Sequence, residues 1–508
     1  MLKIAFRVDA SIHIGSGHVM RCLVLADALS INGHQVVFLT RPQAGDLISF
    51  IKQRGHNVCP LSALACPVEP VSTDDYQGWL QVPELDDAAE CADLIKSTDL
   101  VIVDHYGIGA LWHKRVKETH DCKVVVIDDL VRAHDAELII DQTLQRHAAE
   151  YNRKNANALV LAGTQYALIA PVFATYHQQC QVEKQPPLRQ PPRILLSMGG
   201  IDAPNATLRA LQALQQLDTK PLVTVLLSPR APNYESVKAF SLQHPHWVTH
   251  IDFVSDMAAL MAEHSLAIGA PGSTSWERAC VGLPSIIIAL AENQQTISRN
   301  LALVGAAKQV DLSRIQTDLV PTYHELLSQY EEIRRINLQL CDGQGVQRVV
   351  KAINRLSEFR LKLRPAITSD IEQVYEWQCK PETRKYALNK AVPSFSEHQA
   401  WMTKKLAANN DYFYIIELVD ENNKETAPVG VVRLDNSAQG QYTISIFIDA
   451  DYFGKGIGKY ALQQIDNLHP DVIINATVLK ENAASQALFS SAGYQRVNSE
   501  QFTRPVVE

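Results

Sequence analysis

The sequence predicts an α/β protein with two consecutive parallel-sheet domains, followed by a smaller α+β domain. Short apolar runs alternate with helical patterns up to about residue 180, and the alternation resumes after a Gln- and Pro-rich break at 181–192. Alternating strands and helices form parallel sheets with helices on both faces. From about residue 360, strand-like runs follow one another through short polar segments, as in a meander. We place the domain boundaries at 1–180, 193–357 and 360–508.

Composition is that of a globular chain and argues against several classes of protein. The 508 residues carry a net charge of −8, which gives no reason to expect nucleic acid as a partner. No apolar run approaches the ~20 residues that span a bilayer, and the N-terminus lacks a signal-peptide pattern. Nine scattered cysteines, without a C-x-x-C pair, are typical of reduced thiols in the cytoplasm. We expect a cytoplasmic protein without membrane insertion, and the oligomeric state stays open.

In the first domain, a buried strand at 2–8 leads through a glycine turn into a helix. Apolar residues recur at helical spacing from Val19 to Leu29, and Gly33 ends this helix. Further apolar strands are expected at 36–39, 100–103, 124–127 and 138–140. Ligands bind beyond the carboxyl ends of parallel strands. The edge where they bind should therefore carry the acidic residues that follow these strands, namely Asp9, Asp104, Asp128 and Asp129.

The turn at 14–18 reads Ile-Gly-Ser-Gly-His. Gly15 and Gly17 let a ligand approach the backbone, and the free N–H groups of the next helix suit an anion. Histidine side chains in general exchange a proton near neutral pH, so His18 at the mouth of this turn suggests a base held over a phosphorylated substrate. The alternative is a helix-capping turn whose histidine satisfies backbone groups. Met20 stands where a dinucleotide fingerprint needs a small residue, and Thr40 and Arg41 stand where it needs an acid, which argues against NAD.

The second domain repeats the architecture of the first. Strands are expected at 194–196, 222–227, 251–253, 266–268 and 285–290, and a helix at 346–356. The first strand leads into a Gly-Gly pair at 199–200, and the fourth leads into a helix start with hydroxyls and N–H groups for a diphosphate, formed by Gly272, Ser273, Thr274 and Ser275.

Glu277 lies one turn into the helix that begins there, where a carboxylate suits a pair of ribose hydroxyls. The alternative is a Ser-capped helix with an acidic first turn. Asn293 and Gln294 offer amides at the same edge of the sheet, and their alternative is another helix start.

Five motifs in order carry a resemblance to a known family. They are Ile-Gly-Ser-Gly-His-Val-Met-Arg at 14–21, Asp-His-Tyr-Gly at 104–107, Ile-Asp-Asp at 127–129, Tyr-Ala-Leu-Ile at 166–169 and Met-Gly-Gly at 198–200. Over most of residues 1–345 the chain resembles the UDP-sugar hydrolases of pseudaminic acid biosynthesis. Its glycine motifs also resemble the GT-B glycosyltransferases that add N-acetylglucosamine to lipid-linked muramyl peptide. The resemblance implies two Rossmann-like domains in a GT-B arrangement.

This resemblance implies hydrolysis of UDP-2,4-diacetamido-2,4,6-trideoxy-β-L-altropyranose to the free sugar and UDP, with His18 as the general base. UDP is a good leaving group, so a base that activates water and donors for the diphosphate suffice, whereas an ordinary glycosidase needs two carboxylates. No metal cluster is visible, so we expect metal-independent hydrolysis. The substrate contacts we expect are Gly15, Gly17, Asp9, Tyr106, Gly199, Gly272, Ser273, Thr274, Ser275, Glu277, Asn293 and Gln294.

The third domain contains Gly-Lys-Gly-Ile-Gly-Lys at 454–459, between a strand and a helix. Successive N–H groups there can hold a pyrophosphate, and the alternative is a flexible hairpin end. The loop and the segment 482–494 resemble GNAT acetyltransferases, although Phe453 and Phe489 replace the family's Arg or Gln and its acidic Tyr. The resemblance implies acetyl-CoA as co-substrate, bound at Gly454, Lys455, Gly456, Ile457, Gly458, Lys459, Asn482 and Ser485.

Within the GNAT group, Trp377, Pro381 and the segment 395–401 resemble the acetyltransferase that acts one step earlier in the same pathway. That enzyme acetylates the 4-amino group of a UDP-4-amino-4,6-dideoxy sugar. The alternative for Trp377 and Trp401 is a place among core aromatics. We therefore expect a bifunctional enzyme. The competing hypotheses are a UDP-sugar glycosyltransferase with a GNAT domain and a non-catalytic nucleotide-sugar-binding protein.

Overall fold

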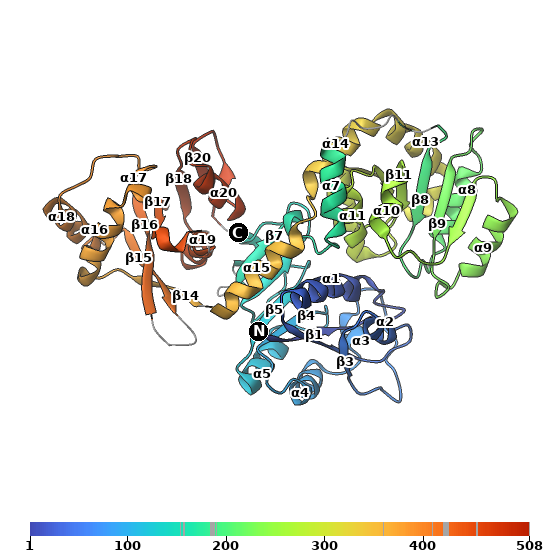
Figure 1. The fold of residues 1–508 in the computed structure, drawn as a ribbon, viewed down its shortest axis with the longest axis horizontal. Coiled ribbons are helices and arrows are strands. Elements are labelled where there is room, and N and C mark those ends of the chain that lie inside the picture. Colours follow the sequence, from blue (N-terminus) through green and yellow to red (C-terminus); the bar gives the residue numbers. More distant parts are fainter. Residues whose placement is uncertain are drawn as a thin grey trace. The chain divides into compact units, whose positions relative to one another are not determined.

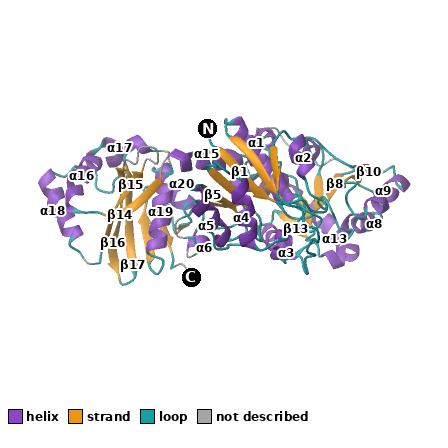
Figure 2. Cartoon of the chain, turned by 90° about the horizontal axis from the view of Figure 1, so that it is seen from below, coloured by secondary structure: helices purple, strands orange, loops and turns teal. Residues whose placement is uncertain are grey.

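The computed structural model of the chain contains three β-sheets, each covered by helices (Figures 1 and 2). It describes residues 1–152, 154–155, 158–182, 188, 190–358, 360–408, 410–419, 426–453 and 456–506. The chain divides into two compact units, each taken by itself below. Unit 1 comprises Met1–Leu130, His134–Arg146 and Leu161–Val350, and unit 2 comprises Val131–Ala133, His147–Val160 and Lys351–Glu508.

The first sheet has the strand order β3-β2-β1-β4-β5-β6-β7, with parallel pairing from β3 through β6. Its strands are β1 Lys3–Val8, β2 Gln35–Thr40, β3 Asn57–Pro60, β4 Leu100–Asp104, β5 Lys123–Ile127, β6 Leu138–Asp141 and β7 Leu159–Ala162. The helices are α1 Gly17–Ile31, α2 Ile48–Gln53, α3 Tyr76–Leu80, α4 Glu84–Leu94, α5 Ala110–His120, α6 Ala149–Asn152 and α7 Val172–Val182. The strand order reverses between β1 and β4, which is where such sheets bind ligands.

The second sheet is parallel throughout, in the order β10-β9-β8-β11-β12-β13. Its strands are β8 Arg193–Ser197, β9 Leu222–Leu226, β10 Val248–Ile251, β11 Leu266–Gly269, β12 Ser285–Ile287 and β13 Ala307–Gln309. The helices are α8 Ala206–Leu214, α9 Tyr234–Gln243, α10 Met257–Ala262, α11 Ser273–Cys280, α12 Gln295–Leu303, α13 Ile315–Ser328, α14 Tyr330–Leu340 and α15 Gly345–Glu358. The order reverses between β8 and β11, so this sheet has the same kind of binding edge as the first.

The third sheet is mixed, in the order β14-β15-β16-β17-β18-β20-β19. Its strands are β14 Arg360–Pro365, β15 Tyr412–Val419, β16 Thr426–Ala438, β17 Gln441–Ile448, β18 Ile473–Thr477, β19 Gln495–Arg496 and β20 Gln501–Arg504. The helices are α16 Ile371–Cys379, α17 Pro381–Arg384, α18 Phe395–Leu406, α19 Ile457–Leu468 and α20 Ala483–Ser491. The predicted meander is present as the antiparallel strands β15, β16 and β17.

Sequence patterning located most strands and misplaced a few. The strand expected at 251–253 is wrong, because β10 runs over Val248–Ile251 and Phe253 is 70% exposed. The strand expected at 285–290 pairs only over Ser285–Ile287. The short strands β3 and β13 were missed, since Asn57–Pro60 and Ala307–Gln309 carry no continuous apolar run. β7 was also missed although it is apolar throughout, and so were β14, β18, β19 and β20 of the third sheet.

Unit 2 includes the segment 147–160, which precedes the second sheet in sequence. Within this unit, the side chain of Gln463 in α19 pairs with the backbone of Val160. Gln463 Oε1 accepts a hydrogen bond from Val160 N at 3.3 Å, and Gln463 Nε2 donates to Val160 O at 3.0 Å. Both residues are 1% exposed, so the pair satisfies buried backbone groups. The boundaries 1–180, 193–357 and 360–508 remain a prediction.

Candidate active sites

The glycine turn lies between β1 and α1, as the sequence predicts. Ser11 holds its base: Ser11 O accepts a hydrogen bond from Gly15 N at 2.8 Å, and Ser11 Oγ accepts one from Ile14 N at 3.1 Å. Gly15 has a φ of +78°, a conformation that favours glycine. A Cβ added to Gly15 or to Gly17 would meet nothing within 4 Å. The backbone of the turn therefore faces open space that a ligand can enter.

His18 is held from behind by Asp104, the last residue of β4. Its Nδ1 lies 2.6 Å from Asp104 Oδ1. A carboxylate only accepts hydrogen bonds, so this contact places the proton of neutral His18 on Nδ1 and leaves a lone pair on Nε2. Among the described residues, nothing forms a hydrogen bond at Nε2, and the side chain keeps 11% of its surface exposed. An oriented histidine with a basic outer nitrogen is the arrangement that general-base catalysis requires.

Arg21, one turn after His18 on α1, keeps Asp104 ionised. Its guanidinium binds both carboxylate oxygens, with Nε at 2.6 Å from Oδ2 and Nη2 at 2.7 Å from Oδ1. Burial of Asp104 raises the pKa of its carboxyl, but the charges and hydrogen bonds of Arg21 and His18 outweigh burial and hold the pKa well below its usual value. Arg21 also reaches Asp129 Oδ2 at 3.2 Å. Asp129 in turn accepts a hydrogen bond from the hydroxyl of Tyr106.

An aromatic wall flanks His18. The ring of Tyr106 lies edge-on to the imidazole, with centroids 4.7 Å apart, and Trp79 lies at 6.5 Å. Tyr76 contacts both Tyr106 and Trp79, at 5.0 and 4.9 Å. The structure therefore places the predicted contact Tyr106 beside His18. The sequence analysis missed Tyr76 and Trp79, which come from the short helix α3 and carry no motif.

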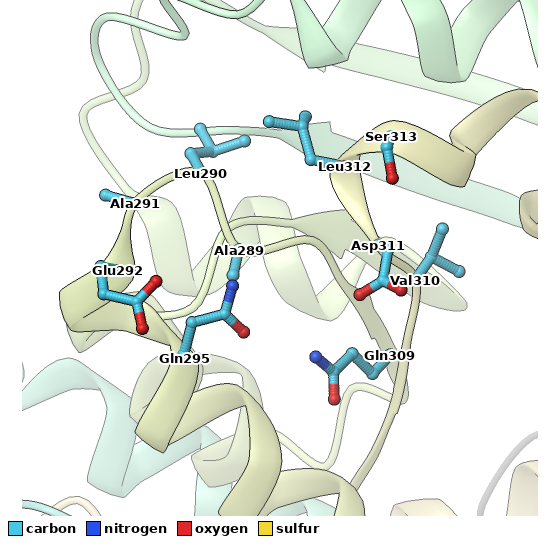
Figure 3. A pocket seen from close by; sticks show the side chains of 10 residues that line it. All are labelled: Ala289, Leu290, Ala291, Glu292, Gln295, Gln309, Val310, Asp311, Leu312 and Ser313. Atoms are coloured by element: carbon cyan, nitrogen blue, oxygen red, sulfur yellow. The ribbon is translucent and has the colours of Figure 1, made fainter.

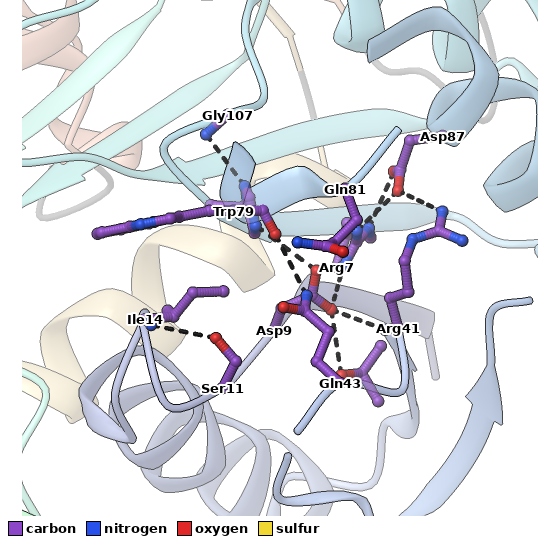
Figure 4. Close-up of polar contacts among 12 residues, drawn as sticks. Arg7, Asp9, Ser11, Ile14, Arg41, Gln43, Trp79, Gln81, Asp87 and Gly107 are labelled. Carbon is purple, nitrogen blue, oxygen red and sulfur yellow. Dashed lines mark hydrogen bonds and ion pairs between the residues drawn. The ribbon is translucent and has the colours of Figure 1, made fainter. Parts of the chain in front are cut away.

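Asp9 follows β1 as expected, but the structure buries it completely. Its Oδ1 accepts hydrogen bonds from Arg7 Nη1 at 2.6 Å and from the backbone N–H of Arg41 at 2.7 Å (Figure 4). Arg7 and Arg41 both also bind Asp87, which makes a buried network of ion pairs. In this environment Asp9 links the ends of β1 and β2, and its expected contact with substrate remains a prediction.

The second sheet presents two glycine turns at its reversal point. Gly199, just after β8, has a φ of +88°, and Gly272, before α11, has a φ of +154°. A Cβ on either would meet nothing within 4 Å, so both turns face open space. A Cβ on Gly200 would lie 3.5 Å from Ser16 Oγ, which places the Gly199–Gly200 turn next to the glycine turn of the first domain within unit 1. The Gly199–Gly200 turn thus lies close to the turn that carries His18.

The start of α11 suits an anion. Its N-cap residue Gly272 supplies no side chain to the helix, so the N–H groups of Ser273 and Thr274 can face a diphosphate. Thr274 is exposed and Ser273 half-buried, whereas Ser275 is buried and its Oγ accepts hydrogen bonds from Gly272 N and Arg278 Nη2. Burial raises the pKa of the half-buried Glu277 to about 7, against the opposing charge of Arg278.

A cavity of about 400 Å3 opens at the carboxyl ends of β12 and β13 (Figure 3). It is lined by residues 289–292 and 309–313 and by Gln295. The predicted contact Gln294 uses its Oε1 to accept a hydrogen bond from Leu290 N at 2.8 Å, and its neighbour Gln295 faces the cavity instead. The side chain of Asn293 lies outside the described residues. Which of the two neighbouring amides points into the cavity depends on where the helix begins, and the sequence pattern did not predict that residue.

In unit 2, β17 and β18 pair in parallel only from Gln441–Ile473 to Thr443–Asn475. Beyond Thr443, β17 runs on to Ile448 without pairing with β18. The two strands therefore diverge toward the end of β17 that leads into α19. The helix begins at Ile457 behind Gly456, whose φ is +78°. Diverging strands followed by an uncapped helix N-terminus can take up an extended thioester with a pyrophosphate. The predicted residues Gly454 and Lys455 lie outside the described residues.

The second predicted acetyl-CoA feature forms a helix cap. Asn482 Oδ1 accepts a hydrogen bond from Ser485 N at 3.1 Å at the start of α20. Phe489 is buried against Tyr494 and Phe502, so it belongs to the core. Trp377 is also buried, and its Nε1 donates to Asp449 at 2.9 Å. Contact of Asn482, Ser485, Ile457, Gly458 and Lys459 with acetyl-CoA remains a prediction.

The described residues contain no group of three or more His, Cys, Asp or Glu side chains placed to hold a metal ion. None of their helices is both long and apolar enough to cross a membrane.

Comparison with known proteins agrees with the two-part chain. Residues 360–495 match the acetyltransferase (GNAT) domain, which implies acetyl-CoA as co-substrate. Among solved structures, the calicheamicin glycosyltransferase CalG4 is 14% identical with a TM-score of 0.50, covering 70% of this chain and 98% of its own. The predicted fold class is thereby confirmed: a GT-B-like pair of α/β domains precedes a GNAT domain.

Three proteins are similar to this chain in sequence. The UDP-2,4-diacetamido-2,4,6-trideoxy-beta-L-altropyranose hydrolase of Campylobacter jejuni is 26% identical over 307 residues, covering 60% of this chain and 97% of its own. The spore coat polysaccharide biosynthesis protein SpsG of Bacillus subtilis is 25% identical over 276 residues, covering 52% and 78%. An uncharacterized protein of Methanocaldococcus jannaschii is 23% identical over 518 residues, covering 97% of each chain. The relatives of the N-terminal part therefore include a protein named as a UDP-sugar hydrolase.

Proposed function

We propose that the chain is a bifunctional nucleotide-sugar enzyme of the cytoplasm. Its GNAT part acetylates a UDP-4-amino-4,6-dideoxy sugar, and its GT-B-like part hydrolyses UDP-2,4-diacetamido-2,4,6-trideoxy-β-L-altropyranose to the free sugar and UDP. The pairing of His18 with Asp104 at 2.6 Å, beside open glycine turns, carries the hydrolase proposal. The GNAT match over residues 360–495 carries the acetyltransferase proposal.

In the hydrolytic step, His18 Nε2 takes a proton from water while the water oxygen attacks the anomeric carbon. The bond from that carbon to the diphosphate oxygen breaks, and UDP leaves with the electron pair. The N–H groups at the start of α11 stabilise the charge that develops on the diphosphate. Asp104 stabilises the imidazolium that forms, because it stays ionised beside Arg21.

In the acetylation step, the neutral 4-amino nitrogen attacks the thioester carbonyl, and the thiolate of coenzyme A leaves and is protonated. The amine gives up a proton in this step, so a base is needed. Phe489 is buried in the core, so it contributes neither acid nor base.

The test of the hydrolase replaces His18. In the full chain, His18→Ala should lower the rate of UDP release by at least about a hundredfold and leave acetyl transfer unchanged. His13→Ala is the matched control, because His13 lies on the same turn and its side chain is 35% exposed. Sugar, UDP and coenzyme A are followed by mass spectrometry. Undiminished hydrolysis in His18→Ala would remove His18 as the base.

The same assay separates hydrolysis from glycosyl transfer. Purified wild-type protein with the diacetamido UDP-sugar and no acceptor should release UDP together with free sugar. Release only after addition of a sugar or lipid acceptor would identify a transferase. Turnover of acetyl-CoA with the amino sugar likewise distinguishes an enzyme from a nucleotide-sugar-binding protein.

A further inference from the structure

A buried arginine lies behind the turn that leads into α11. Arg278 is 4% exposed, and its Nη2 donates to Ala270 O at 2.9 Å and to Ser275 Oγ at 3.2 Å. A Cβ placed on Gly269, the last residue of β11, would lie 2.6 Å from Arg278 Nη1. The guanidinium therefore lies between the end of β11 and the start of α11.

The charge of Arg278 has no hydrogen-bonded carboxylate among the described residues. Its hydrogen bonds there go to a carbonyl and a hydroxyl, and its buried Nε has no partner. Burial lowers the pKa of Arg278 to about 10, although the charge of Glu277 opposes this effect. Glu277 is a weak counter-charge at neutral pH, because burial raises the pKa of its own carboxyl to about 7. A buried charge is costly unless an opposite charge compensates it, so a bound anion would stabilise this arginine.

The turn that Arg278 contacts lies where an anion can bind. Gly269 pairs with Ser197 at the reversal point of the second sheet, which is where parallel sheets bind ligands. A Cβ on Gly272 would meet nothing within 4 Å, so the turn faces open space. Ser275 Oγ accepts a hydrogen bond from Gly272 N at 3.3 Å as well as the one from Arg278. Through Ser275, Arg278 thus holds the turn whose helix start is assigned above to the diphosphate.

We propose that Arg278 is a positioning residue of the hydrolase site, which holds the Gly272 turn and whose buried charge is compensated by the diphosphate of a bound nucleotide. The inference rests on the proposed hydrolase and deepens it, because it names the residue that makes the site select a nucleoside diphosphate over an uncharged nucleoside. Arg278 acts through Ser275 and through its charge. A charge that lies one layer of backbone away from the diphosphate, in a poorly solvated place, changes affinity by about tenfold to a hundredfold.

The test compares UDP with uridine as ligands of the full chain, by isothermal titration calorimetry. Arg278→Met should lower the ratio of the uridine dissociation constant to the UDP dissociation constant by about tenfold to a hundredfold, with the uridine constant changed less than about twofold. Arg278→Lys keeps a positive charge, so its ratio should stay within about fivefold of the wild-type value. Arg335→Met removes an arginine whose side chain is 58% exposed, and as the matched control it should leave both constants within about twofold.

Thermal unfolding separates this role from a merely structural one. UDP should raise the unfolding temperature of Arg278→Met by less than it raises that of the wild type, whereas uridine should raise both by the same amount. An arginine with only a structural role would lower the unfolding temperature without changing the increment that UDP adds.

Three results would overturn the inference alone. They are an unchanged ratio in Arg278→Met, equal losses of UDP and uridine binding in that variant, and a ratio in Arg278→Lys that falls by more than about fivefold. The lysine variant decides the question where the methionine variant does not fold. A wild-type chain that binds UDP no better than uridine would instead overturn the proposed diphosphate site of the hydrolase.

Discussion

At the scale of single residues, Asp104 sets the environment of His18 in the proposed hydrolase site. It is fully buried, yet it is ionised because Arg21 binds both of its oxygens. It fixes the tautomer of His18 and stabilises the charge that His18 gains. A buried carboxylate that both Arg21 and His18 bind is costly to remove, since Arg21 then loses its counter-charge.

We predict that Asp104→Asn lowers kcat for UDP release by about 10²–10⁴-fold, because the amide can orient the wrong tautomer and cannot stabilise an imidazolium. The free energy of unfolding should also fall, by about 3 kcal/mol, since Arg21 loses a buried partner. Steady-state assays of UDP release measure kcat, and urea unfolding measures the free energy of unfolding. Asp27→Asn, which alters a surface ion pair with Arg54, is the control and should leave kcat unchanged.

At the scale of elements, the first two sheets place different residues at the points where their strand orders reverse. The β1–β4 reversal places His18 and Asp104, whereas the β8–β11 reversal places the glycine turn at Gly199 and the start of α11 behind Gly272. Glu277 belongs to this second edge, one turn inside α11, where burial makes its charge costly. Because the folded chain disfavours the charged form of Glu277, stability should depend on pH in the range where this carboxyl titrates.

We predict a pH effect on stability from Glu277. Its pKa rises from an ordinary 4.5 to about 7 in the folded chain, so the folded state binds the proton more tightly than the unfolded state. The stabilisation is complete below about pH 4.5 and is lost as pH rises through about 7. Compared with Glu277→Gln, the wild type should therefore lose unfolding free energy between pH 5 and 8. Parallel stability-against-pH curves for the two proteins would contradict this.

At the scale of the whole molecule, unit 2 is assembled from segments far apart in the chain. Segment 147–160 joins residues 351–508 in it, and the Gln463–Val160 pair holds two buried backbone groups that have no other hydrogen bond among the described residues. The C-terminal part therefore depends on a piece of chain that precedes the second sheet. A GNAT domain cut out at residue 360 would lack that piece.

We predict that Gln463→Ala lowers the free energy of unfolding of the full chain by about 2–4 kcal/mol, because Val160 N and O become buried without partners. Amide hydrogen exchange should speed up at Val160 and along α19. Gln339→Ala, at an exposed site of α14, serves as control and should change stability by less than about 0.5 kcal/mol. An unaltered unfolding curve in Gln463→Ala would show that solvent replaces the pair.

Sequence patterning predicted the architecture because apolar alternation and periodicity report burial directly. It missed β13, whose sequence Ala-Lys-Gln has no apolar run, and it placed β10 too late because it followed Ile251 into Phe253. For the site, His18 carried a local signal in its glycine turn. Its partner Asp104 lies 86 residues away, and only the sheet order brings the two together.

The Gln463–Val160 pair has a consequence for recombination. In a chimera that joins the C-terminal part of this chain to a foreign N-terminal part, the side chain of Gln463 would lack the backbone of Val160 as its hydrogen-bond partner. A C-terminal part that is transferred together with residues 147–160 would keep both hydrogen bonds.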